Sequence, residues 1–282
     1  MKFCTRIVSV LGIALLGFSW QSVNAERAII FSTAPTQSVK LTRERYQPIA
    51  DYLTKAIGRK VKLVPSQNFV QYSRSVIKGD YDLIFDGPQF VSWRMARDND
   101  TRHNVLAKLP GKLRFVVAVR RDLRVNNVRR LAGKRVCAVA SPNLLTLGFL
   151  DLFPNPSSVP VMVSVKSFKK GLGCALKNNG VGVILRDKFW NKVSAKKPKI
   201  RRGLKLLYTA KVAWPHRAFS ISNKIDRETQ NRIKNALLSA GGTKASKKVL
   251  KQFKSKSFVP ASTAEYTGHG KLLKPIWGFH EQ

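Results

Sequence analysis

Two patterns of apolar positions alternate along the chain after residue 25. Short apolar runs rich in β-branched and aromatic residues predict buried strands at 27–32, 60–64 and 81–85. Between them, apolar residues recur every three or four positions in 43–57 and 69–77, and a glycine ends each segment, which predicts two helices. This strand–helix–strand–helix–strand order is typical of an α/β lobe with a mainly parallel sheet.

The same alternation restarts in the middle of the chain. A continuous apolar run at 115–119 is long enough for a strand that passes from one lobe to another, so we predict a second α/β lobe after it. The segments 155–160 and 196–202 are expected to be surface loops, and the tail from Phe258 is expected to be irregular. Further strands are predicted at 135–139, 161–165, 181–185, 204–208 and 217–221, and further helices at 128–131, 144–153, 168–177, 227–240 and 244–253.

The first 25 residues have the pattern of a secretory signal peptide. Lys2 and Arg6 precede an apolar run at 7–18, and small residues stand at Val23 and Ala25, the two positions that a signal peptidase reads. We therefore expect cleavage after Ala25 and a periplasmic protein. The alternative is an uncleaved anchor helix, but the apolar run is short for a bilayer span.

The charge is strongly positive, with 52 Lys and Arg against 15 Asp and Glu and a formal net charge of +37, and the leader holds only two of these cations. In a cytosolic protein this balance would favour nucleic acid as the partner. Export argues against that partner and favours an anionic small ligand, or a weak contact with an anionic surface. The cations are also scattered, as on an ordinary solvated surface.

Two cysteines remain after the leader, Cys137 and Cys174. An even number of cysteines in an exported chain permits a disulfide, so we predict that they pair. The alternative is two buried thiols that pack as small apolar side chains.

Several segments, taken in order, resemble one known family. They are 45–53 with 57–61, the run 79–88, the segment 131–143, and the ending at 258–266. Together they are similar to the phosphate-, phosphite- and phosphonate-binding proteins of bacterial ABC importers, a branch of the type II periplasmic binding proteins.

The resemblance implies an architecture and a role. It implies two α/β lobes joined by two crossing strands near 115–119 and 217–221, with a hinge that closes over a ligand in the cleft. Lobe 1 would comprise 26–116 and 218–282, and lobe 2 would comprise 117–217. The protein would be a monomer that delivers its ligand to an ABC permease in the inner membrane.

The candidate ligand site consists of loops that follow predicted strands, because ligands of open α/β sheets bind beyond the carboxyl ends of the strands. For several of these residues a structural role is an open alternative: a polar turn at 32–37, a helix cap at Asp86, and hinge packing by Trp214. Phe69, Trp93 and Phe115 are candidate aromatic walls. The predicted ligand-binding residues are Ser32, Thr33, Thr36, Gln37, Phe69, Asp86, Gly87, Ser141, Asn143, Thr146, Arg186, Trp214 and Arg217.

One of these loops departs from the pattern that the resemblance implies. Phosphonate-binding members typically carry a Ser-Thr-Ser-Gly turn after the Pro-Asn position, whereas here Leu144-Leu145-Thr146-Leu147 follows Asn143. A leucine cannot donate a hydrogen bond to an oxyanion, so a different or larger ligand becomes plausible.

No motif of an enzyme or of a cofactor site stands out. The four histidines lack metal-ligand spacing, and neither a phosphate-binding Gly-Lys-Ser/Thr loop nor a nucleophile elbow is present. We therefore expect a non-enzymatic solute-binding component of an ABC importer that needs no cofactor or metal. The alternatives are a periplasmic sensor or adaptor, and an envelope protein that binds anionic surfaces through its charge.

Overall fold

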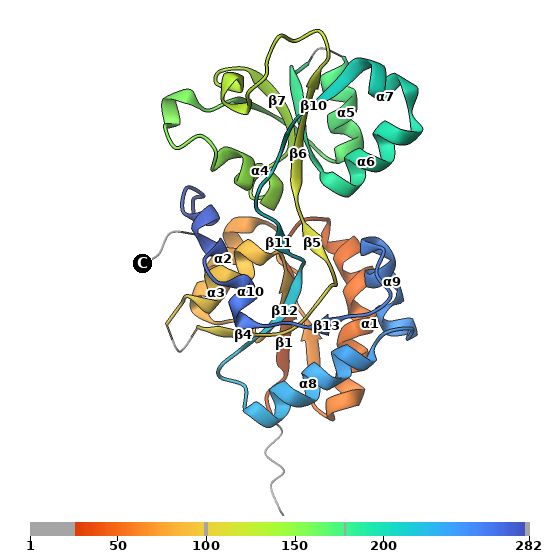
Figure 1. Cartoon of the computed structure of the whole chain (residues 1–282). Helices are drawn as coiled ribbons and strands as arrows, with labels where there is room; N and C mark the ends of the chain where they lie inside the picture. Colours follow the sequence, from red (N-terminus) through yellow and green to blue (C-terminus); the bar gives the residue numbers. More distant parts are fainter. Residues whose placement is uncertain (1–25, 99–100, 178, 280–282) are drawn as a thin grey trace, which may run out of the picture.

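The computed structural model describes residues 26–98, 101–177 and 179–279, which form two α/β bodies stacked one above the other (Figure 1). Each body is built on its own β-sheet with helices against its faces. The two-lobed α/β architecture is confirmed. The predicted leader and its predicted cleavage site lie outside the described residues.

The lower body contains a six-stranded sheet in the order β13-β4-β12-β3-β1-β2. β1 pairs in parallel with β2 and β3, whereas β12 pairs antiparallel with both β3 and β4. The strands are β1 (Ile29–Ser32), β2 (Val61–Leu63), β3 (Leu83–Asp86), β4 (His103–Lys108), β12 (Ala218–Ser222) and β13 (Val259–Pro260). The helices are α1 (Val39–Ile57), α2 (Phe69–Lys78), α3 (Pro88–Met95), α8 (Arg227–Ser239), α9 (Lys244–Phe253) and α10 (Thr263–Tyr266), with the 3-10 helix η3 (His269–Leu273).

The upper body contains a five-stranded sheet in the order β10-β6-β9-β7-β8. β7 pairs in parallel with β8 and β9, and β6 pairs antiparallel with β9 and β10. The strands are β6 (Phe115–Arg120), β7 (Arg135–Val139), β8 (Val161–Val165), β9 (Gly182–Arg186) and β10 (Leu204–Thr209). The helices are α4 (Leu144–Leu150), α5 (Phe168–Leu176), α6 (Asp187–Lys196) and α7 (Pro198–Gly203), with the 3-10 helices η1 (Val128–Leu131) and η2 (Pro156–Ser158).

A two-stranded antiparallel ribbon joins the two bodies (Figure 1). It consists of β5 (Lys112–Leu113) and β11 (Trp214–Pro215). The crossings therefore lie a few residues before each predicted position. The run at 115–119 is apolar because β6 is a buried strand of the upper sheet, and 218–222 forms β12 of the lower sheet.

Local sequence signals explain where the first helices begin and end. The side chain of Ser38 accepts a hydrogen bond from Leu41 N at the start of α1, and Gly58 ends this helix with φ 71°, a left-handed conformation that glycine adopts without strain. Asn68 and Gly79 perform the same roles for α2.

Three segments predicted to lack regular structure contain helices, and the first is the expected loop 155–160, which contains the 3-10 helix η2. The expected loop 196–202 contains most of α7, where Pro198 occupies the first turn, a position at which proline favours a helix start. The tail contains β13, α10 and η3, because its buried residues Tyr266 and Leu273 pack into the lower body.

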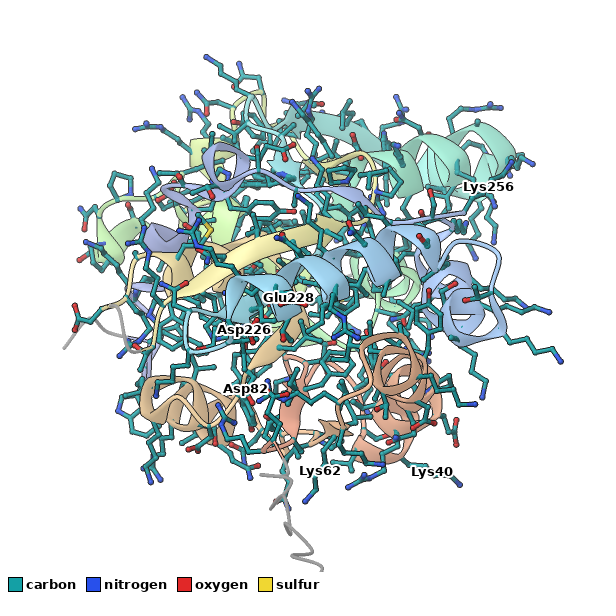
Figure 2. The ribbon with its side chains drawn as sticks, turned by 90° about the horizontal axis from the view of Figure 1, so that it is seen from below. Lys40, Lys62, Asp82, Asp226, Glu228 and Lys256 are labelled. Atoms are coloured by element: carbon teal, nitrogen blue, oxygen red, sulfur yellow. A yellow bond between two sulfur atoms is a disulfide. The ribbon has the colours of Figure 1, made fainter. Side chains whose placement is uncertain are left out.

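Both signs of charge appear on the face of the lower body that points away from the upper one. Figure 2 shows this face, with the carboxylates of Asp82, Asp226 and Glu228 toward its middle and Lys40 and Lys62 toward its edge. Asp82 binds the Arg27 guanidinium at 2.7 Å. Within the described part of the chain, no helix has the length and apolar character needed to cross a membrane.

The predicted disulfide between Cys137 and Cys174 is confirmed. It joins β7 to α5 inside the core of the upper body, where Cys137 is fully buried. The bridge closes a loop of 37 residues in sequence. Such a bridge stabilises a fold mainly because it restricts the unfolded chain.

Replacing both cysteines by alanine is expected to lower the free energy of unfolding by about 2–4 kcal/mol, the range for loops of this length. Denaturant titration of the double variant beside the oxidised parent measures the change. The reduced parent is the matched control and should lose a similar amount. Equal stability of all three forms would contradict a stabilising role for the bridge.

Candidate functional site

A cleft of about 860 Å³ lies between the two bodies, beside the connecting ribbon. Its lower wall comes from the loops after β1 and β3 and the start of α3, and its upper wall comes from the loops after β7, β8 and β9. These are the carboxyl ends of the parallel strands, where open α/β sheets bind ligands. The cleft has the size of pockets that hold small organic molecules.

The lower wall combines aromatic rings with the amide side chains of Gln89 and Gln252. Phe69 stacks on Phe90, with ring centroids 5.8 Å apart, and both line the cleft. Gln89 Nε2 donates to the Pro142 carbonyl oxygen at 3.0 Å and so links the two bodies. Gln89 Oε1 is buried without a partner among the described residues. A Cβ at Gly87 would come within 2.5 Å of this Oε1, so glycine makes room for the side chain.

The upper wall is largely apolar where the resemblance implies an oxyanion turn. Leu144 and Leu145 are buried and line the cleft. The side chain of Asn143 caps α4 by accepting from Leu145 N. The one remaining hydroxyl of the turn, on Thr146, donates to the Val139 carbonyl oxygen at 2.6 Å and does not line the cleft.

Three cations line the cleft, Lys166, Arg186 and Arg217, and no aspartate or glutamate among the described residues lines it. Arg186 is the last residue of β9, and its Nε is buried without a partner in the described part of the chain. Burial lowers the pKa of the Arg186 guanidinium, while the Asp187 carboxylate acts in the opposite sense. The Arg217 guanidinium lies over the ring of Phe253, 5.4 Å from its centroid. The lining is therefore suited to an anion.

His216 lies among these cations and is held in its neutral form. Burial is the main cause, and the positive charges of Arg186, Arg217 and Lys188 add to it, so the pKa of His216 falls to about 3. Its Nδ1 accepts a hydrogen bond from Arg217 N at 2.9 Å, which fixes the proton on Nε2.

This depressed pKa predicts that acid destabilises the protein. In the unfolded chain His216 binds a proton below about pH 6.5, whereas the folded protein resists protonation until about pH 3. Stability is therefore fully present above pH 6.5 and is lost as the pH falls from there, by up to about 1.4 kcal/mol per pH unit for this group. Burial also lowers the pKa of His103, which acts in the same direction.

Urea titrations at pH 7, 6, 5 and 4.5 measure this slope. The variant His216→Asn should reduce the slope, because asparagine does not titrate. Burial lowers the pKa of the half-buried His269 as well, but less than that of His216, so His269→Asn should reduce the slope by a smaller amount. A His216→Asn slope equal to that of the parent would contradict the interpretation.

The structure brings part of the predicted site together in the cleft. Seven of the predicted residues line it: Thr36, Phe69, Gly87, Ser141, Asn143, Arg186 and Arg217. Among the others, Ser32 and Thr33 are buried, and the Ser32 hydroxyl donates to the Val64 carbonyl oxygen at 2.7 Å. Gln37 accepts a hydrogen bond from Arg45 instead of lining the cleft.

Three of the candidate aromatic residues are packing residues: Trp93, Phe115 and Trp214. Trp214 stacks on Phe115, with ring centroids 6.0 Å apart, and a Cβ at Gly148 would come within 2.4 Å of its ring. Trp93 packs against Phe279. Trp214 was considered either as a ligand contact or as a packing residue of the hinge. The structure shows hinge packing, because the ring is buried in the core beside the ribbon.

Asp86 does not line the cleft, because α3 supplies a cation that binds it. Arg94 donates to both carboxylate oxygens at 2.8 Å, and both side chains are fully buried. Tyr72 donates to the same carboxylate, and the guanidinium also donates to Ser220 Oγ at 2.8 Å. Asp86 thus anchors α3 to β3 and β12.

Several residues of the cleft were not identified from the sequence. Gln89 and Phe90 follow the predicted Gly87 directly, so the turn itself was a signal for them. Gln252 and Phe253 come from the end of α9, which no sequence pattern connects with the strand-end loops. Some of the cleft residues outside the predicted set belong to the candidate loops and others do not. They are Pro35, Pro88, Gln89, Phe90, Leu113, Val139, Ala140, Pro142, Leu144, Leu145, Ser164, Val165, Lys166, Phe168, His216, Gln252 and Phe253.

A search of the described residues for groups of three or more His, Cys, Asp and Glu side chains that could hold a metal ion finds none.

Comparison with known proteins gives a family match over most of the chain. Residues 31–266 match the model of a family described as the periplasmic phosphonate substrate-binding protein of ABC transporters. A 140-residue segment is 27% identical to the phosphate-import protein PhnD of Mycolicibacterium smegmatis, and it spans 46% of this chain and 42% of that relative. The chain thus matches less than half the length of this relative.

Solved structures share the fold. PhnD1 of Prochlorococcus marinus in complex with methylphosphonate superposes with a TM-score of 0.64 at 17% identity, over 88% of this chain and 98% of that one. XAC2383 of Xanthomonas citri bound to ATP superposes with a TM-score of 0.70 at 13% identity, over 90% and 99% of the two chains. At these identities the likeness is one of fold.

Proposed function

Because this chain belongs to the family of periplasmic phosphonate substrate-binding proteins of ABC transporters, we propose that it binds an organic phosphonate or phosphate in the cleft between its two bodies. In this role the bound protein delivers the ligand to an ABC permease. Ligand binding and an ABC transporter partner are the role of the family.

The observation that carries the proposal is the pair Arg186 and Arg217 in a cleft lined by no described acidic residue. A guanidinium donates two parallel hydrogen bonds to a phosphonate more readily than an ammonium does. The unpartnered Nε of Arg186 supplies a buried donor, which is costly to leave without an acceptor. An oxyanion at this position satisfies it.

The two arginines also belong to different bodies. Arg186 ends β9 of the upper sheet, and Arg217 directly precedes β12 of the lower sheet. An anion bound by both guanidinium groups favours the closed arrangement of the bodies over an open one, since only the closed arrangement offers both contacts. This is how ligand binding becomes a change of shape that a permease can recognise.

The apolar upper wall favours an organic substituent on the anion. Leu144, Leu145, Phe69 and Phe90 offer surface to an alkyl or aryl group and no donor side chain to a second oxyanion contact. Burial of such a group is favourable by about 25 cal/mol per Å² of apolar surface removed from water. We therefore assign the charge of the ligand to the arginines and its organic part to the leucine and phenylalanine walls.

A single chain carries both walls of the cleft, so a monomer suffices for this role. We infer that it acts in the periplasm after loss of residues 1–25, and that nucleic acid is not its partner. We also infer a weak contact between its scattered surface cations and an anionic surface.

Isothermal titration of chain 26–282 with phosphate, methylphosphonate and phenylphosphonate tests the proposal, with benzyl alcohol as the uncharged control. Phenylphosphonate should bind saturably in about 0.15 M salt, and at least about tenfold more tightly than methylphosphonate because its ring is buried. Benzyl alcohol should not bind. Absence of binding by all three anions would overturn the proposal.

A further inference from the structure

A second cavity, of about 430 Å³, adjoins the cleft on the side where α6 and the end of α9 face each other (Figure 1). Its other walls are Leu109 and Pro110, at the entrance to the connecting ribbon. The two cavities share the lining residues Phe168, Arg186, His216, Gln252 and Phe253.

The shared residues mark the passage between the cavities. Phe168, Arg186 and Phe253 line both cavities. The buried Nε of Arg186 has no partner among the described residues. A group bound by Arg186 therefore lies where the cleft continues into the second cavity.

The second cavity is lined by further cations. Lys188 and Lys192 project from α6, and Lys254 is the C-cap residue of α9. No aspartate or glutamate of the described chain lines this cavity. Lys254 has φ 53°, a left-handed conformation that usually favours glycine, so the end of α9 carries a lysine at a strained position of this wall.

One phosphonate does not use all of these charges. Arg186 and Arg217 together donate enough hydrogen bonds for a single phosphonate group, which leaves three lysines beyond Arg186 with no acidic residue in the wall to balance them. Positive charges that line a concave surface raise the local concentration of anions. Burial is the main cause of the lowered pKa of His216, and Lys188 is among the cations that add to it.

We propose that the cleft and the second cavity form one binding site for an organic diphosphate or bisphosphonate. The first phosphate-type group binds between Arg186 and Arg217, and the second group, one bridging atom away, binds to Lys188, Lys192 and Lys254. The organic substituent lies against the leucine and phenylalanine walls of the cleft. This inference rests on the proposed function and narrows its ligand class.

The matched probes are methylphosphonate and methylenediphosphonate, which differ by the second phosphonate group. Titration calorimetry in about 0.15 M salt should show that methylenediphosphonate binds at least about tenfold more tightly to the parent chain, since each added charge-assisted contact contributes about that much. The triple variant Lys188→Ala, Lys192→Ala, Lys254→Ala should lose this preference. Its affinity for methylphosphonate should change less than about twofold.

The control variant carries Lys196→Ala, Lys199→Ala and Lys247→Ala, three exposed lysines on α6, α7 and α9 that line neither cavity. It removes the same net charge and should keep the preference for methylenediphosphonate. Circular dichroism and thermal midpoints of both triple variants should match those of the parent, because all six side chains are exposed.

The possible outcomes distinguish failure of the diphosphate site from failure of the proposed function. If methylphosphonate binds but methylenediphosphonate binds no more tightly, or if the cavity triple variant keeps the preference, the diphosphate site is refuted while the proposed function stands. Loss of the preference in both triple variants would indicate a general charge effect and would also refute the site. If neither probe binds the parent, and phosphate and phenylphosphonate do not bind it either, both the diphosphate site and the proposed function are refuted.

Discussion

Replacing Arg186 by alanine is expected to weaken binding of phenylphosphonate by about 100-fold or more. Arg186 lines the cleft where it continues into the second cavity, and it is half-buried, with an Nε that has no partner in the described chain. Its removal leaves the anion with only Arg217 and the exposed Lys166 as cationic contacts, and loss of a charged hydrogen-bonding group in a buried site costs about 3 kcal/mol or more. Isothermal titration measures the change.

Two further variants show whether charge alone or geometry decides the affinity. Arg186→Lys keeps the charge without the planar fork, so it should recover only part of the loss. Arg202→Ala removes an exposed arginine from α7 of the same body and should leave the affinity unchanged. An Arg186→Ala protein with the affinity of the parent would remove Arg186 from the site.

Replacing Arg94 by methionine is expected to lower the free energy of unfolding by about 3–5 kcal/mol. Arg94 and Asp86 are both fully buried, and the substitution leaves the Asp86 carboxylate without its counter-charge. Tyr72 and Ser220 also lose their contacts with the guanidinium. Urea denaturation at pH 7 measures the loss.

The double variant Asp86→Asn, Arg94→Met is the matched test of this explanation. Because the cost arises from an unpaired buried charge, removing the carboxylate as well should restore much of the lost stability. Asp122→Asn is the control for an exposed ion pair, with Arg120 as its partner, and should leave stability almost unchanged. A double variant less stable than Arg94→Met would contradict the explanation.

The order of strands and helices could be predicted from local patterns. Apolar spacing located α1 and α2 within a few residues, and glycines located their ends, because periodicity and capping depend on neighbours in sequence. The same patterns underlie the predicted strand-end loops that supply Gly87, Asn143 and Arg186 to the cleft. Segments such as β4 and α7, whose residues are mixed in polarity, acquire their structure from the sheet and helices against which they pack.

The direction in which polar side chains point could not be predicted. Ser32 and Thr146 carry hydroxyls at strand-end loops, but each donates to a nearby backbone carbonyl instead of facing the cleft. Whether a hydroxyl meets a ligand or a carbonyl depends on backbone geometry that a residue type does not specify. Asp86 was predicted to contact the ligand because the sequence does not show which side chain its carboxylate meets. Its partner Arg94 becomes adjacent only when α3 packs on β3 and β12.

The sequence by itself determined that this chain forms two α/β bodies, that its two cysteines after the leader can pair, and that its charge suits an anion. Each of these follows from composition or local periodicity. Only the tertiary structure decided which cations face the cleft and that α9 contributes Gln252 and Phe253 to it. It alone also places a second cavity with three lysines beyond Arg186. The physical reason is that a binding site is a juxtaposition of distant segments, and packing between sheets and helices fixes those distances.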